Sequence, residues 1–152
     1  MKKINLSVKI NAPVKKVWDT LIGEKTYREW ASTFSPGCYF KGDWSKGSKM
    51  LFLGPDPQTG KEGGMVSEIA DNIPYKFISI QHNGYINDGV EDTTSAQIKA
   101  WAPSYENYTF TEIGDSTEFT LDMDTTDEYH EMFLELWPKA LAKLKEICER
   151  SV

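Results

Sequence analysis

The order of hydrophobic patterns along this chain constrains its fold more than any other feature. An alternating segment at residues 2–10 is followed by an amphipathic helix that starts at Pro13, by a long strand-rich region, and by one amphipathic helix from about Thr125 onward. A single long helix at the end of an antiparallel sheet must bury its apolar stripe, so we expect it to pack on the concave face of that sheet. The pattern predicts an α+β fold with a groove between the last helix and the sheet.

The strand-rich region is divided by turn residues into segments of strand length. In residues 2–10, apolar and polar residues alternate, as expected of a half-buried strand. Two short helices, at 13–22 and 24–32, precede the next strand. The six further strands that we predict lie at 38–41, 48–53, 64–70, 75–82, 105–113 and 117–124.

The final helix has both a start signal and a continuous apolar stripe. Thr125 and Glu128 have the spacing of a capping box. Pro138 removes one backbone hydrogen bond inside the helix, so we predict a bend between Leu134 and Pro138. The stripe comprises Tyr129, Met132, Phe133, Leu136, Trp137, Ala140, Leu141, Leu144, Ile147 and Cys148.

Residues 83–104 fit neither a strand nor a helix pattern over their whole length. Residues 87–94 are acidic and rich in turn formers, and 94–101 could form a short helix. Long insertions of this kind are often functional or mobile. We expect this segment to act as a lid near the groove.

Composition excludes several classes of function. The 152 residues are long enough for one domain, 1–152, with a substantial core. The 17 basic and 23 acidic residues give a net charge of -6, which argues against nucleic acid or an anionic membrane surface as a partner. We find neither a signal peptide nor an apolar run long enough for membrane insertion, and expect a cytoplasmic protein. Cys38 and Cys148 lack metal-binding or redox spacing and are interpreted as ordinary thiols.

Two motifs resemble ligand sites but depart from the chemistry that such sites need. The glycine-rich run 54–62 has five residues between its glycines, two prolines, and Glu62 where a phosphate loop has Ser or Thr. We interpret it as a hairpin loop. Asp88, Glu91 and Asp92 lack the ligand spacing of a calcium loop, so a solvated acidic loop is the simpler interpretation. We therefore predict no cofactor and no metal.

The two histidines have different expected environments. His82 shares a strand face with Ile78 and Ile80 and should point into the groove, as a hydrogen-bonded core residue, a polar ligand anchor or a general base. His130 lies near the edge of the helix stripe and is predicted to be on the surface. Without a nucleophile paired to either histidine, a hydrolase triad has no support.

Several segments in this order resemble the START-like superfamily, and within it the family of Hsp90 ATPase activator homologues. They are Ile10-Asn11-Ala12-Pro13 with Val17-Trp18-Asp19 and Leu21, then Trp30, then Gly64-x-Val66-x-Glu68-Ile69, and the terminal Trp137-Pro138-x-Ala140-Leu141 with Leu144-Lys145. The resemblance implies a helix-grip fold: a curved seven-stranded antiparallel sheet around a long C-terminal helix, two short helices after strand one, and a cavity between helix and sheet. The superfamily has no shared catalytic motif to transfer.

The inward aromatic, apolar and methionine side chains either fill a solid core or line such a cavity. We predict that the cavity binds a small apolar or amphipathic ligand, with Tyr108 and His82 as its polar groups and Met123 on the same inward face. One alternative is a polyketide cyclase or dehydratase that uses His82 or a buried carboxylate as acid or base. Another is a co-chaperone or stress-response protein that binds a protein partner through an exposed apolar patch. The predicted ligand-binding residues are Trp30, Phe34, Phe52, Met65, His82, Trp101, Tyr108, Phe110, Phe119, Leu121, Met132, Phe133 and Trp137.

Overall fold

The predicted order of strands and helices is present in the structure, a computed structural model that describes residues 1–56 and 59–150. Pro57 and Gln58, in the glycine-rich run, lie outside the described residues. The elements are β1 (Lys2–Ile10), α1 (Val14–Ile22), α2 (Glu24–Trp30), η1 (Ala31–Thr33), β2 (Tyr39–Gly42), β3 (Lys49–Pro55), β4 (Glu62–Ile73), β5 (Phe77–Asn87), β6 (Val90–Asp92), α3 (Ala96–Lys99), β7 (Ser104–Ile113), β8 (Ser116–Thr125) and α4 (Asp127–Glu149).

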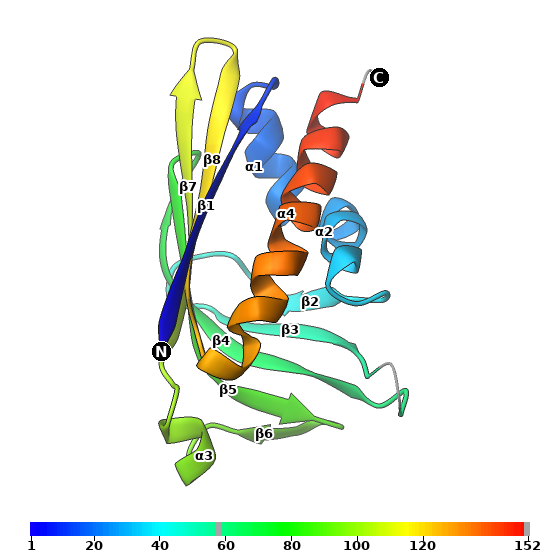
Figure 1. Cartoon of the computed structure of the whole chain (residues 1–152), viewed down its shortest axis with the longest axis vertical. Coiled ribbons are helices and arrows are strands. Elements are labelled where there is room, and N and C mark those ends of the chain that lie inside the picture. Colours follow the sequence, from blue (N-terminus) through cyan, green and yellow to red (C-terminus); the bar gives the residue numbers. More distant parts are fainter. Residues whose placement is uncertain (57–58, 151–152) are drawn as a thin grey trace.

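The strands form one antiparallel sheet in the order β1-β8-β7-β5-β4-β3-β2, with β6 paired to β5 beyond this path. The first strand therefore pairs with the last, from Lys2 opposite Thr125 to Ile10 opposite Thr117. The sheet curves around α4, and α1 and α2 lie on the same side of the sheet as α4 (Figure 1). This arrangement confirms the predicted α+β helix-grip fold, with β6 as a short additional strand.

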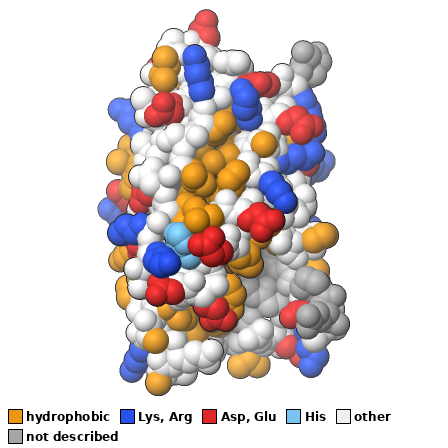
Figure 2. Space-filling model, in the orientation of Figure 1, with side chains coloured by type: hydrophobic (Ala, Val, Ile, Leu, Met, Phe, Trp, Pro, Cys, Tyr) orange, Lys and Arg blue, Asp and Glu red, His pale blue; other side chains and the backbone are white. Residues whose placement is uncertain are grey.

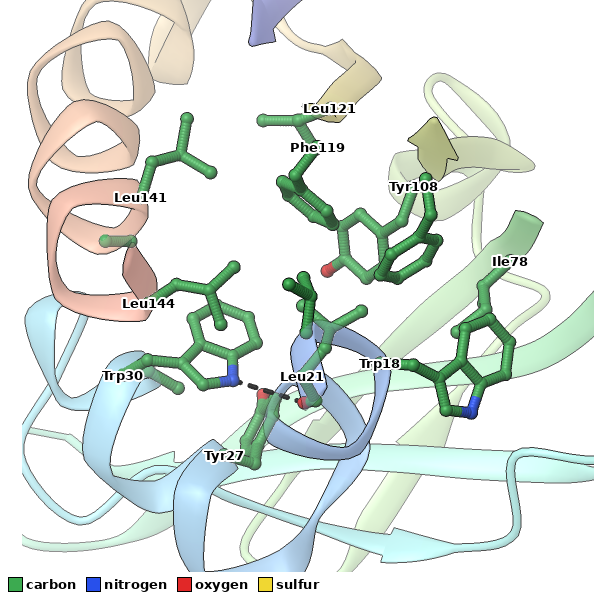
Figure 3. Packing of buried hydrophobic residues seen from close by; sticks show 14 of the residues in the cluster. Trp18, Leu21, Tyr27, Trp30, Ile78, Tyr108, Phe119, Leu121, Leu141 and Leu144 are labelled. Atoms are coloured by element: carbon green, nitrogen blue, oxygen red, sulfur yellow. Dashed lines mark hydrogen bonds between the residues drawn. The ribbon is translucent and has the colours of Figure 1, made fainter. Parts of the chain in front are cut away.

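The C-terminal half of α4, called here its rear half, closes the main hydrophobic core. Leu141 and Leu144, which are 5% and 1% exposed, point from α4 toward Phe119 and Leu121 of the sheet (Figure 3). Trp30 also lies in this core, where its indole N–H donates to the Leu21 carbonyl at 3.1 Å. Burial of such large apolar side chains is the dominant favourable contribution to folding.

The predicted capping box at the start of α4 is wrong. Thr125 is the last residue of β8, where pairing with β1 holds it in the sheet, and the helix begins at Asp127. The N-cap is Thr126, whose side chain makes no capping hydrogen bond. Asp127 and Glu128 do lie in the first turn, where their charges favour the positive end of the helix dipole.

The strand predicted at 75–82 begins and ends later than expected, because Tyr75 lies in a turn with a φ of 65° and β5 continues to Asn87. The extension pairs with β6, and a Cβ on Gly84 would lie 2.0 Å from the Asp92 carbonyl oxygen. Glycine is thus required for this close approach. Most of the segment predicted as a lid is a β-hairpin followed by α3.

The structure also bears on several smaller predictions about the helices and His130. The helix α4 continues through Pro138 without interruption, and the bend predicted between Leu134 and Pro138 stays a prediction. His130 is half-buried, with a side chain 17% exposed, which corrects the predicted surface position. The helix predicted at 24–32 ends at Trp30 and continues as the 3-10 turn η1. No described helix combines the length and apolar character that crossing a membrane requires.

Candidate ligand-binding cavity

A cavity of about 460 Å³ lies between the N-terminal, or front, half of α4, the α2–η1 segment and the sheet. Side chains from the strands β3, β4, β5, β7 and β8 line the cavity. This volume lies within the usual range of small-molecule sites. Ten of the thirteen predicted ligand-binding residues line it: Trp30, Phe34, Phe52, Met65, His82, Trp101, Tyr108, Met132, Phe133 and Trp137.

The other three predicted residues, Phe110, Phe119 and Leu121, do not line this cavity. They are 5%, 0% and 0% exposed and belong to the solid core. Trp18 of α1 covers this part of the sheet, with its ring centroid 5.1 Å from that of Phe110. Strand periodicity places these side chains on the inner face of the sheet. It does not reveal where helices pack directly against that face.

The mouth of the cavity lies near the start of α4. Met1, Tyr129 and Met132 line the cavity and are 60%, 40% and 42% exposed, so apolar surface leads from solvent to the interior. Hydrophobic side chains also gather along the middle of the face where α4 lies beside β1, with charged side chains on both sides (Figure 2). Tyr85 and Trp101 also line the cavity, with ring centroids 4.9 Å apart.

A chain of four polar side chains crosses three adjacent strands at the cavity wall. The Ser67 Oγ on β4 lies 2.7 Å from Nδ1 of His82 on β5. The Nε2 of the same histidine lies 3.1 Å from Oε1 of Glu106 on β7. The Tyr108 hydroxyl donates to the second oxygen of this carboxylate. The register explains the chain, because Ser67 lies opposite His82 and His82 lies opposite Ser104, two residues before Glu106.

Two tyrosine hydroxyls in the cavity, those of Tyr108 and Tyr27, have raised pKa values. Burial, with the Glu106 carboxylate as the next cause, raises the pKa of the Tyr108 hydroxyl well above its ordinary value. The same two causes raise the pKa of Tyr27, which also lines the cavity. Both phenols stay protonated at neutral pH, and Tyr108 acts as a hydrogen-bond donor to Glu106.

Glu106 belongs to this polar chain, and the sequence interpretation did not name it. It lies two residues before Tyr108 in a strand, so the same period of two that placed Tyr108 inside also places Glu106 there. A charged residue on an inward face is the signal that could have found it. The cavity also contains Tyr27, Tyr85 and Leu136, which were not predicted as ligand-binding residues.

Two further donors in the wall are unpaired. Among residues 1–56 and 59–150, no partner accepts a hydrogen bond from the indole N–H of Trp101 or of Trp137, and both nitrogens are buried. Within the same described ranges, no three His, Cys, Asp or Glu side chains gather in a way that could hold a metal ion. The wall is therefore mainly aromatic, with one hydrogen-bonded polar chain.

An antiparallel sheet that grips a long C-terminal helix, with two short helices after the first strand, defines the START-like class of protein. Residues 11–149 match the family described as activator of Hsp90 ATPase homolog 1-like protein. The chain belongs to this family, as its sequence motifs indicated. A comparison with curated proteins gives no match.

Solved structures with the same fold come from several bacteria. Protein MLL2253 from Mesorhizobium loti is 16% identical, with a TM-score of 0.72 over 99% of each chain. The Aha1 dimer from Colwellia psychrerythraea is 18% identical, with a TM-score of 0.67 over 98% of this chain and 97% of the other. CalU16 from Micromonospora echinospora is 21% identical, with a TM-score of 0.63 over 97% of this chain and 65% of the other. At these identities the likeness shows the fold alone.

Proposed function

We propose that this chain acts as a single START-like domain whose cavity binds a small apolar or amphipathic molecule. The observation that carries the proposal is the cavity of about 460 Å³, which has an aromatic wall and an apolar mouth at the start of α4. Ligand sites are typically concave and apolar with a few placed polar groups, which here are His82, Glu106 and Tyr108. The ligand body would lie against the aromatic wall.

A titration with the neutral dye Nile red tests this proposal. Its fluorescence rises in an apolar site, so we expect saturable binding with one molecule per chain. The Met65→Trp variant places a larger side chain inside the cavity and should weaken binding at least about tenfold, since it removes the space that the dye occupies. Leu134→Trp, at an exposed position outside the cavity, is the matched control and should bind like the wild type.

The titration has two outcomes that would count against a ligand-binding cavity. One is the absence of saturable binding by the wild-type chain. The other is equal loss of binding in the Met65→Trp and Leu134→Trp variants, which would show that the dye attaches to the surface. Circular dichroism of each variant establishes that the fold is retained.

The His82–Glu106 contact favours one second candidate, an enzyme of cyclase or dehydratase type. A histidine that is hydrogen-bonded to a carboxylate at a cavity wall can accept or donate a proton. In that case, a molecule that co-purifies with a His82→Asn variant should be converted to a product by the wild-type chain, as followed by mass spectrometry. Recovery of the molecule unchanged would argue for a carrier.

A further inference from the structure

The charged side chains that line the cavity are acidic, and the positive amino terminus of Met1, which also lines it, acts on Asp124. Among the described residues that line it, Glu106 and Asp124 are acidic and none is a lysine or an arginine. Asp124 lies toward the mouth and is paired with Lys3, whose Nζ is 2.6 Å from Oδ1. Glu106 has no lysine or arginine partner among the described residues, and its carboxylate is hydrogen-bonded to the His82 ring and the Tyr108 hydroxyl. Its side chain is 15% exposed.

His82 links Glu106 to the neighbouring strand β4. The Ser67 hydroxyl has no hydrogen-bond partner other than the His82 ring among residues 1–56 and 59–150. When this hydroxyl donates to Nδ1, the imidazole proton lies on Nε2, where it donates to Glu106. In this arrangement all three hydrogen bonds between Ser67, His82, Glu106 and Tyr108 are satisfied.

The cavity thus presents a carboxylate with unused acceptor capacity inside an aromatic wall. Each Glu106 oxygen accepts one hydrogen bond from the protein and can accept a second. The rings of Trp30, Phe34 and Trp137 line the same cavity and lie together, with centroids of Phe34 and Trp137 4.9 Å apart. Aromatic faces attract cations, and a desolvated carboxylate is costly to bury without a positive partner. The aromatic rings and the carboxylate therefore both favour a ligand with a positive charge and an apolar body.

We propose that the ligand of this cavity is a hydrophobic amine, whose protonated nitrogen pairs with Glu106 while its apolar body packs on the aromatic wall. The inference rests on the proposed ligand-binding function. Two acidic side chains, Asp127 and Glu128, lie in the first turn of α4 beside Tyr129, whereas Lys3 and the Met1 amino terminus act on Asp124. The two carboxylates of the first turn offset the positive end of the helix dipole and attract cations toward the opening.

Three small probes with one apolar body test the proposal. They are 4-phenylbutylamine, 4-phenyl-1-butanol and 4-phenylbutyrate, which at neutral pH are cationic, neutral and anionic. Binding is measured by calorimetry and by the fluorescence of the tryptophans that line the cavity. We expect the amine to bind at least about tenfold more tightly than the alcohol, which corresponds to about 1.4 kcal/mol. The carboxylate should bind most weakly.

The Glu106→Gln variant removes the charge and keeps the shape of the side chain. We expect it to lose the preference for the amine over the alcohol. Glu112→Gln is the matched control, because this residue is an exposed glutamate on the same strand and outside the cavity. It should retain the wild-type preference.

The outcomes separate this inference from the proposed function. Equal or tighter binding of the alcohol or the carboxylate by the wild-type chain would overturn the amine ligand and leave a ligand-binding cavity in place. The wild-type series gives this answer even if Glu106→Gln does not fold. Retention of the full preference by a folded Glu106→Gln variant would also overturn it. If no probe binds and Nile red does not bind, both proposals fail.

Discussion

Three leucine-to-alanine substitutions along α4 test whether the front of this helix borders a cavity and the rear borders a solid core. Leu144 is 1% exposed, Leu136 is half-buried at the cavity wall, and Leu134 is 38% exposed outside the cavity. The substitution is the same at all three positions of one helix. Differences in helix propensity therefore cancel, and only the surroundings of the side chain differ.

The structure sets the size of each effect. Leu144→Ala removes a fully buried side chain and leaves a new void, so we expect a loss of about 2–5 kcal/mol in the free energy of unfolding. Leu136→Ala removes a side chain that already borders open space. It loses part of its burial and creates no new closed void, which gives a loss of about 1 kcal/mol. Leu134→Ala should stay within about 0.5 kcal/mol of the wild type.

Urea unfolding followed by tryptophan fluorescence and circular dichroism measures these differences. Equal slopes with denaturant concentration would show that the three variants unfold from comparable states. A loss for Leu136→Ala as large as that for Leu144→Ala would refute the reasoning, because it would mean that the front of α4 packs as tightly as the rear. A near-zero loss for Leu144→Ala would refute it as well.

Three further predictions concern the polar chain and the sheet. Tyr108→Phe leaves one Glu106 oxygen without its donor and should destabilise the fold by about 1–3 kcal/mol in urea unfolding; a neutral result would contradict the hydrogen bond. Because burial raises the pKa of Tyr27 and Tyr108 above the ordinary value of 10.0, the unfolded chain releases these protons first as the pH rises. Their contribution to stability is therefore complete below pH 10 and declines above it, and absorbance at 295 nm should show two tyrosines that titrate only on unfolding. Gly84→Ala should lower the thermal midpoint, since its Cβ would lie 2.0 Å from a carbonyl oxygen of β6, and an unchanged midpoint would show that β6 can shift without cost.

The fold was predictable because its elements have strong periodic patterns. The alternation in β8 and the stripe of α4 place their inner faces without reference to the rest of the chain. Element boundaries were less accurate, as the late end of β5 shows. That strand continues because β6 pairs with it, and a partner strand that is only three residues long leaves little signal of its own.

The candidate site was predictable in kind but not in extent. Period two identified His82 and Tyr108 as inward residues, and both line the cavity. The same reasoning placed Phe119 at the cavity, although α1 and the rear of α4 fill the space above it. Which inward side chain meets a helix and which meets open space depends on how the layers pack.

The sequence by itself determined the α+β class, the order of the elements and the aromatic character of the interior, since these follow from local periodicity and composition. Only the tertiary structure decided where the interior stays open. It also decided that Ser67, His82, Glu106 and Tyr108, from three strands, form one hydrogen-bonded chain. These contacts depend on strand register, which is set by pairing across the whole sheet rather than by any single segment.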